Sequence, residues 1–226
     1  MNEALSDMRL EEIIEKWGKR YSELLGINLS RARDDDIFKW FLASVLFGAP
    51  INESSALKTY RCFEKYDVLT PKAILKTGWD GLVKILDEGG YARYDFKTAD
   101  KLLRIMQNLT EKYSGSLNLI CEQVSDKTDL EKRLKALGKG VGSVTVSIFL
   151  RELRGIWSKA DPKPTALVIL AAENLRIIKK NASAEEALVQ LKDYWSRNKV
   201  RDKSFIDFET ALVRLGKKLR KASKTQ

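Results

Sequence analysis

A glycine-rich turn between two expected helices is the segment of this chain best suited to chemistry. Gly138, Gly140 and Gly142 stand at every second residue, with Lys139 and Ser143 beside them. Glycines permit a tight reversal and leave backbone N–H groups bare at the start of the second helix, where a phosphate can bind. The competing interpretation is an ordinary helix–helix turn that ends on glycine. We expect phosphate contacts from all five residues.

A single acidic residue, Asp161, follows this turn at the start of the next helical segment. A carboxylate can stabilise a developing positive charge, and it can orient or deprotonate a nucleophile. Asp161-Pro162 is also a good helix N-cap followed by a proline in the first turn. The two roles are compatible, because a capping position also fixes the carboxylate.

Composition narrows the chemistry and the partners. The 226 residues include no histidine, which excludes histidine triads, histidine bases and histidine metal sites. Cys62 and Cys121 are the only cysteines, too few for a disulfide framework or a four-cysteine cluster, so a reducing interior is the simplest compartment. The N-terminus carries no signal-peptide pattern, and no apolar run reaches membrane-spanning length. We therefore expect a soluble protein with no membrane partner.

The net charge of +10 favours an anionic partner such as nucleic acid, although it also serves solubility alone. Basic residues surround the glycine turn, where Glu131 and Glu152 are the only acids between residues 131 and 160. These basic residues are Lys132, Arg133, Lys135, Lys139, Arg151, Arg154 and Lys159. The C-terminal end is basic as well, with no acid from Val213 onward.

The elements that must position these residues are helices. Apolar residues recur at helical spacing nearly throughout, and no convincing strand or internal repeat occurs. Start and stop signals predict helices over 13–25, 37–47, 54–66, 71–76, 78–89, 98–113, 129–137, 142–153, 164–174, 183–195 and 205–219. The prediction is an all-α fold of two helical lobes with a cleft between them. A central lobe would span 36–153 and end in the hairpin of 129–153, and a second lobe would combine 1–35 with 154–226.

These features resemble the helix-hairpin-helix DNA glycosylases, a superfamily that includes endonuclease III and the alkylated-base and adenine glycosylases. The turn at 137–145 is similar to their signature hairpin, and Asp161 stands at nearly the family's distance from it. Two upstream stretches, 42–50 and 89–94 with Lys97 after it, also resemble the family. The order and spacing of the four matches are more specific than any one of them.

The resemblance implies excision of a base from duplex DNA that carries a damaged or mispaired nucleotide. Such enzymes flip the nucleotide out of the duplex and break its N-glycosidic bond, so Asp161 would stabilise the oxocarbenium ion and activate water. Val144 occupies the position of the catalytic lysine of bifunctional members, which implies a monofunctional enzyme. Because Val144 is at helical spacing from Val141, packing in the core is a second explanation for a valine there. Three alternatives stay open: a lyase that uses a displaced lysine such as Lys163, a hairpin protein that binds DNA without catalysis, and an all-α protein-interaction domain without DNA affinity.

The resemblance also implies roles for residues away from the turn. Lys97 would contact the DNA backbone, Pro50 or Ile51 would wedge into the base stack, and Tyr91 would press on the opposite strand. Three aromatic residues are candidates for the base pocket, although core packing explains each of them as well: Trp40, Trp157 and Tyr94. No iron–sulfur cluster or other cofactor is expected, with room left for a monovalent cation at the hairpin. We expect a monomer. Its expected location is the cytoplasm, in association with the nucleoid, or a nucleus.

Overall fold

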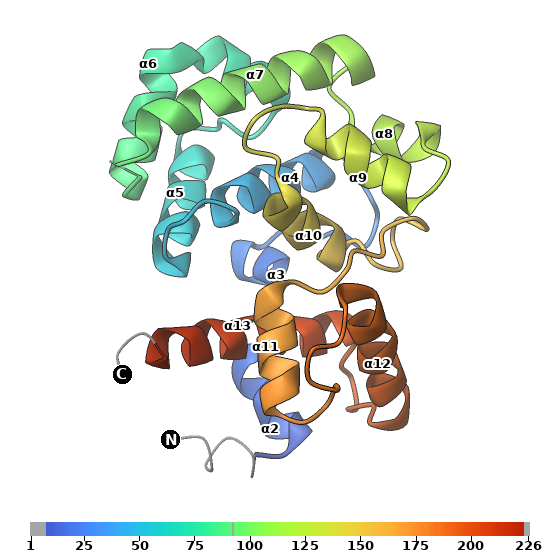
Figure 1. Ribbon diagram of the computed structural model, residues 1–226. Helices are drawn as coiled ribbons and strands as arrows, with labels where there is room; N and C mark the ends of the chain where they lie inside the picture. The colour runs from blue at the N-terminus through green and yellow to red at the C-terminus, as the bar shows by residue number, and fades with distance from the viewer. Residues whose placement is uncertain (1–7, 92, 224–226) are drawn as a thin grey trace. The chain divides into compact units, whose positions relative to one another are not determined.

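The computed structural model describes residues 8–91 and 93–223, and every regular element within them is a helix (Figure 1). The all-α fold class expected from the sequence is confirmed. The chain divides into two compact units: unit 1 combines residues 1–24 with 163–226, and unit 2 comprises 25–162. None of the helices in the described part of the chain is long and apolar enough to cross a membrane.

Unit 2 extends beyond the lobe of residues 36–153 that the sequence indicated, because polar contacts tie both flanking segments to it. Before this range, the carbonyl of Ala32 accepts a hydrogen bond from Asn118 Nδ2 at 2.8 Å. After it, Trp157 donates from Nε1 to Asn118 Oδ1 at 2.9 Å. One asparagine side chain thus holds a residue from each flanking segment.

Unit 2 is built around α4 (Asp34–Phe47), which is apolar on most of its sides and is largely buried. A helix of this pattern is expected at the centre of a helical unit. The helices that pack on it are α5 (Glu53–Lys65), α8 (Leu117–Gln123) and α10 (Ser143–Glu152). The remaining helices of this unit are α6 (Pro71–Gly89), α7 (Asp95–Tyr113) and α9 (Lys127–Lys135). In Figure 1, α6 and α7 lie side by side, and α9 connects through a loop to α10.

Unit 1 has its core where α13 packs against α11 and α2. Gly216 of α13 allows a close approach to α11, because a Cβ at this position would lie 2.1 Å from the carbonyl oxygen of Leu167. The capping box predicted for Ser183 and Glu186 is confirmed at the start of α12. The helices of this unit are α2 (Leu10–Trp17), most of α3 (Tyr21–Leu25), α11 (Ala166–Asn174), α12 (Ala184–Arg197) and α13 (Phe205–Ala222).

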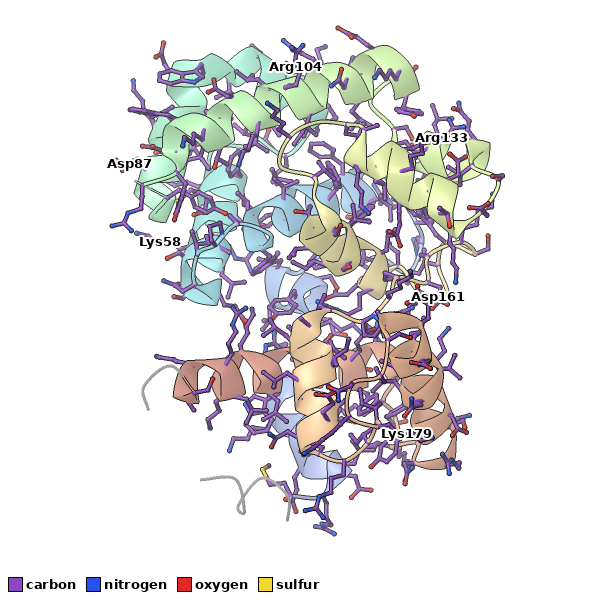
Figure 2. All side chains as sticks on the ribbon, viewed as in Figure 1. Lys58, Asp87, Arg104, Arg133, Asp161 and Lys179 are labelled. Atoms are coloured by element: carbon purple, nitrogen blue, oxygen red, sulfur yellow. The ribbon has the colours of Figure 1, made fainter. Side chains whose placement is uncertain are left out.

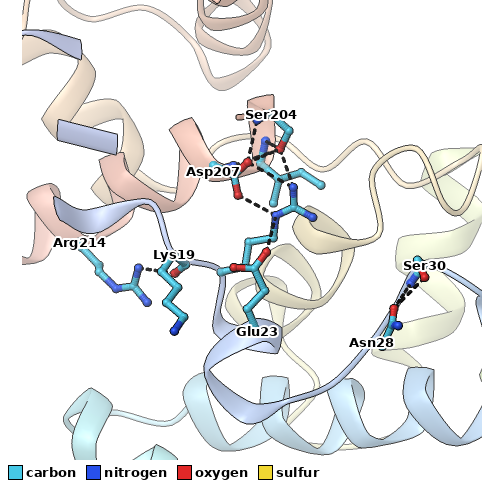
Figure 3. A network of polar contacts seen from close by, with 9 residues as sticks. Lys19, Glu23, Asn28, Ser30, Ser204, Asp207 and Arg214 are labelled. Atoms are coloured by element: carbon cyan, nitrogen blue, oxygen red, sulfur yellow. Dashed lines mark hydrogen bonds and ion pairs between the residues drawn. The ribbon is translucent and has the colours of Figure 1, made fainter. Parts of the chain in front are cut away.

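A polar network joins the segment between α2 and α3 to the start of α13 (Figure 3). Arg20 donates from Nε to Asp207 Oδ1 at 2.7 Å and from Nη2 to Ser204 Oγ at 2.8 Å. Ser204 and Asp207 also form a capping box. Burial alone would raise the pKa of Asp207, but the hydrogen bonds from Arg20 and Ser204 outweigh it and hold this pKa below its ordinary value. The network fixes where the N-terminal segment meets α13.

The structure tests two of the helix predictions and contains one helix that was not predicted. The helix expected over 13–25 is interrupted after α2 by Gly18. The break predicted at Gly78 is confirmed, because Gly78 has φ 67 and ψ −179 within the Pro71–Gly89 helical run. Helix α8 was not predicted, because its seven residues carry too short an apolar pattern to be distinguished from a loop.

Candidate active site and nucleic-acid interface

The turn between α9 and α10 requires two of its three glycines for its backbone conformation. Gly138 has φ 156 and Gly140 has φ 112, in the region that residues with a Cβ avoid. Gly142 has an ordinary φ of −87, and a Cβ there would meet nothing within 4 Å. The tight reversal expected of the three glycines therefore does not require glycine at position 142. What remains for Gly142 is the access that it leaves to the start of α10.

The start of α10 presents backbone N–H groups that the described chain does not use. Gly142 is the N-cap, and it has no side chain with which to accept a hydrogen bond. The N–H groups of Gly140, Gly142, Ser143 and Val144 find no acceptor within residues 8–91 and 93–223. Lys139 and Ser143 are exposed beside them. Bare N–H groups and the helix dipole together favour an anion at this end of the helix.

Two helices hold the turn in place. On α7, Asn108 donates from Nδ2 to the carbonyl of Leu137 at 2.8 Å. On α10, Thr145 donates from Oγ1 to the carbonyl of Gly140 at 3.0 Å. The same Thr145 abuts Gly48 after α4, where an added Cβ would lie 2.3 Å from the threonine oxygen. The turn is therefore anchored through both its first and its second half.

The loop between α4 and α5 carries the expected wedge residues, and it begins beside the turn because Gly48 contacts Thr145. Pro50 is exposed and Ile51 is half-buried. The start of this loop thus lies beside the threonine that bonds to the turn. Their role as wedges stays a prediction.

Tyr91 does not offer a surface to DNA. Its side chain is 1% exposed, and its hydroxyl donates a hydrogen bond to the carbonyl of Leu46. Burial raises the pKa of this hydroxyl. A ring enclosed in this way cannot press on an opposite strand, so the expected wedge role of Tyr91 is corrected to a core role.

Two of the three base-pocket candidates are core residues as well. Trp40 is buried and donates from Nε1 to the carbonyl of Phe149 at 3.0 Å. Trp157 is buried with its ring edge-on to Phe149, at 5.4 Å between centroids. Both indoles have their ring faces and their N–H groups occupied inside unit 2, so the pocket role expected for them is corrected to packing. Tyr94 is half-buried before α7, and its role stays a prediction.

Asp161 lies in the connection between α10 and α11 (Figure 2). The expected N-cap role is wrong, because α11 begins at Ala166 with Thr165 as its N-cap. Pro162 and Pro164 explain the later start, since a residue before proline is driven into extended conformations. The carboxylate is therefore fixed by something other than a helix.

Arg154, which follows α10, supplies that restraint. Its Nη1 forms an ion pair with Asp161 Oδ1, and its Nη2 donates to the carbonyl of Pro162 at 2.7 Å. The Arg154 side chain is 9% exposed, whereas that of Asp161 is 31% exposed. The guanidinium thus orients the carboxylate and compensates part of its charge, while solvent still reaches the acid. In the sequence, Arg154 was one of several basic residues near the turn, and nothing distinguished it.

The amines and the valine near the turn differ in exposure. Val144 is 56% exposed, so the packing explanation for it is not supported. Lys163 is exposed and forms an ion pair with Glu185. Lys97 is exposed on α7, and Lys101, one turn further on, packs its side chain against Gly140. The sequence interpretation missed Lys101, although its spacing of four from Lys97 was a signal.

A protein metal site requires side chains that can bind the ion to lie close together. Within the described residues, no group of three or more His, Cys, Asp or Glu side chains could hold a metal ion. Cys62 is a buried free thiol, and Cys121 is a half-buried one. The expectation that the chain works without a cofactor stays an expectation.

The all-helical fold is shared with a DNA glycosylase. The crystal structure of the H. pylori 3-methyladenine DNA glycosylase MagIII bound to 1,N6-ethenoadenine is similar with a TM-score of 0.55 and 13% sequence identity. The similarity covers 96% of this chain and 99% of that chain. No family model and no curated protein matches the sequence. The likeness therefore concerns the fold.

Proposed function

We propose that this chain is a DNA glycosylase that acts as a monomer and excises a damaged or mispaired base from duplex DNA. The observation that carries the proposal is the glycine turn, whose bare N–H groups stand at the start of α10. The basic composition around the turn and a fold that a known DNA glycosylase shares add support. Contacts of this kind position a duplex without reading its sequence.

In this proposal Asp161 is the catalytic residue. The target nucleotide leaves the base stack, and its glycosidic bond breaks as the sugar gains positive charge. A nearby carboxylate stabilises that charge and orients the attacking water. Because Arg154 compensates part of the negative charge of Asp161, we assign Asp161 chiefly the orientation of the attacking water.

The nucleophile in the proposed reaction is water. The first turn of α10 carries Val144 where a bifunctional enzyme would carry a lysine, and a valine cannot attack the sugar. The product would be an intact abasic site and a free base. Because the structural neighbour is described as a 3-methyladenine glycosylase bound to 1,N6-ethenoadenine, alkylated adenines are the first substrates to test.

One observation favours a second candidate, a hairpin protein that binds DNA without catalysis. The Asp161 carboxylate is engaged by Arg154, and an acid in an ion pair is less able to stabilise a cationic sugar. The lyase alternative has less support, because Lys163 is itself paired with Glu185. Borohydride trapping of a covalent DNA adduct would distinguish the lyase from the other two.

The test is base release from duplexes that carry alkylated, oxidised, deaminated or mismatched bases, followed by alkaline cleavage of the abasic site. We expect Asp161→Asn to lower the single-turnover rate by about 10²–10³-fold, with DNA affinity retained. Asp87→Asn is the matched control, because Asp87 is an exposed acid of α6 in the same unit. Retained activity in Asp161→Asn would remove the assigned role. Tight DNA binding by wild-type protein with no base release from any lesion would favour the binding protein instead.

A further inference from the structure

We propose that α7 carries a second phosphate-binding row, formed by Lys97, Lys101 and Arg104, which extends the contact of the glycine turn along a nucleic-acid backbone. The ligand class is the phosphodiester backbone of a duplex. The inference rests on the proposed function only in taking DNA as the polyanion.

The three side chains share one face of α7 and border the turn. Their spacing of four and then three residues places them on the same side of a helix. An added Cβ on Gly140 would lie 3.0 Å from Cδ and 3.4 Å from Cγ of Lys101. An added Cβ on Gly138 would lie 3.7 Å from Cγ of Arg104, and Figure 2 shows Arg104 on α7. The apolar stems of Lys101 and Arg104 therefore cover the turn, and their charged ends extend beyond it.

The row and the turn are held as one piece. Asn108 lies one turn beyond Arg104 on α7, and its Nδ2 donates to the carbonyl of Leu137 at 2.8 Å. This hydrogen bond fixes the start of the turn against the helix that carries the row. A backbone bound at the turn would therefore meet the row in a constant register.

The row keeps its positive charge. Lys97, Lys101 and Arg104 form no ion pair with any residue that the structure describes. On α9, by contrast, two of the basic residues are paired with acids four positions earlier, as Arg133–Asp129 and Lys135–Glu131. Lysine and arginine side chains that no acid neutralises are what counterion release from DNA requires.

The acid placed to neutralise the row is occupied elsewhere. Asp100 precedes Arg104 by four residues and follows Lys97 by three, which are pairing distances on a helix. Its Oδ1 instead accepts a hydrogen bond from Trp79 Nε1 of α6 at 2.9 Å. The ring of Trp79 lies against Phe96, with 5.2 Å between centroids. Trp79 is thus a positioning residue that keeps Asp100 away from the row.

The experiment measures the affinity for an undamaged duplex between 50 and 200 mM salt. We expect the triple variant Lys97→Ala, Lys101→Ala, Arg104→Ala to lose about 0.9 from the slope of log K against log salt for each contact, roughly 2.7 in all. Over this fourfold range of salt, the wild type would lose about 40-fold more affinity than the variant. Lys84→Ala is the matched control, because Lys84 is an exposed lysine on α6 of the same unit. A thermal melt of each variant checks that it folds.

A wild-type slope in the triple variant would overturn the proposal, as would an equal reduction by Lys84→Ala or a wild type that binds no duplex at the lowest salt. The variant Trp79→Phe keeps an aromatic ring and removes the indole donor. We expect it to lower the slope by about 1, with recovery when Asp100→Asn is added. A slope that Trp79→Phe leaves unchanged would contradict the positioning role.

Base release measured on the same variants separates this inference from the proposed function. A reduced slope together with no base release by the wild type would uphold the row and refute the glycosylase. Base release by the wild type together with an unchanged slope in the triple variant would uphold the glycosylase and refute the row.

Discussion

The variant Gly142→Ser separates the structural role of the turn from its proposed role in binding. Gly142 has the extended ψ of −178 that an N-cap requires, and a Cβ there meets nothing within 4 Å. Ser183 and Ser204 already cap α12 and α13 from the same position. The new hydroxyl is therefore expected to stabilise the protein by a few tenths of a kcal/mol relative to glycine. In a chain of this length such a gain raises Tm by about 1 °C.

The same substitution is expected to weaken DNA binding. The hydroxyl of an N-cap serine accepts from the N–H groups of the second or third helical residue, here Val144 and Thr145. The N–H of Val144 is one of the bare groups that would otherwise face a phosphate. Loss of one hydrogen bond to a charged group costs about 1.5–3 kcal/mol, which is roughly a 10- to 150-fold increase in Kd. The salt dependence should stay unchanged, because no lysine or arginine contact is lost.

Fluorescence anisotropy with a labelled duplex gives Kd, and a thermal melt gives the stability. A stabilised variant that binds DNA as tightly as the wild type would refute the anion-binding role of the turn. A destabilised variant would show instead that Gly142 does not have the N-cap conformation in which a serine is stabilising. Because stability should rise while DNA affinity falls, this variant is more informative than one that lowers both stability and affinity.

Two further predictions concern the contacts that the structure revealed. Asp207→Asn should cost about 1.5–3 kcal/mol of unfolding free energy at neutral pH, because the charged hydrogen bonds from Arg20 are lost. The pKa of Asp207 is lowered in the folded protein, so its contribution to stability is present above about pH 4 and is lost as the pH falls through the folded pKa. Urea titrations should therefore show the stabilities of the wild type and the variant converging in acid. A difference in stability that stays constant with pH would contradict this. Tyr91→Phe should cost about 1 kcal/mol, because the buried carbonyl of Leu46 loses its donor. It should leave DNA affinity unchanged, and a marked loss of affinity at unchanged stability would contradict the core role of Tyr91.

The local features of the site could be predicted from the sequence because they are properties of the backbone. The positive φ of Gly138 and Gly140 follows from residue type at a chain reversal. The kink at Gly78 and the capping box at Ser183 are equally local. Each depends on residues within a few positions of one another, so a single sequence is enough to indicate them.

The side-chain environments could not be predicted in the same way, because they depend on residues far apart in the chain. Tyr91 is enclosed against the end of α4, and the N–H of Trp40 is satisfied by Phe149 of α10. An aromatic residue has the same appearance in a sequence whether it lines a pocket or fills a core. Exposure decides between the two, and exposure is set by the assembled helices.

Helix α10 links the two parts of the candidate site through its two ends. Its N-terminus presents the bare N–H groups of the turn, and Arg154, just past its C-terminus, holds Asp161. Its ten residues span about 15 Å as one rigid element. A change in the seating of α10 on α4 would therefore move the anion site and the restraint on the acid together. For this reason a substitution at the contact between Gly48 and Thr145 should affect both DNA affinity and the orientation of Asp161.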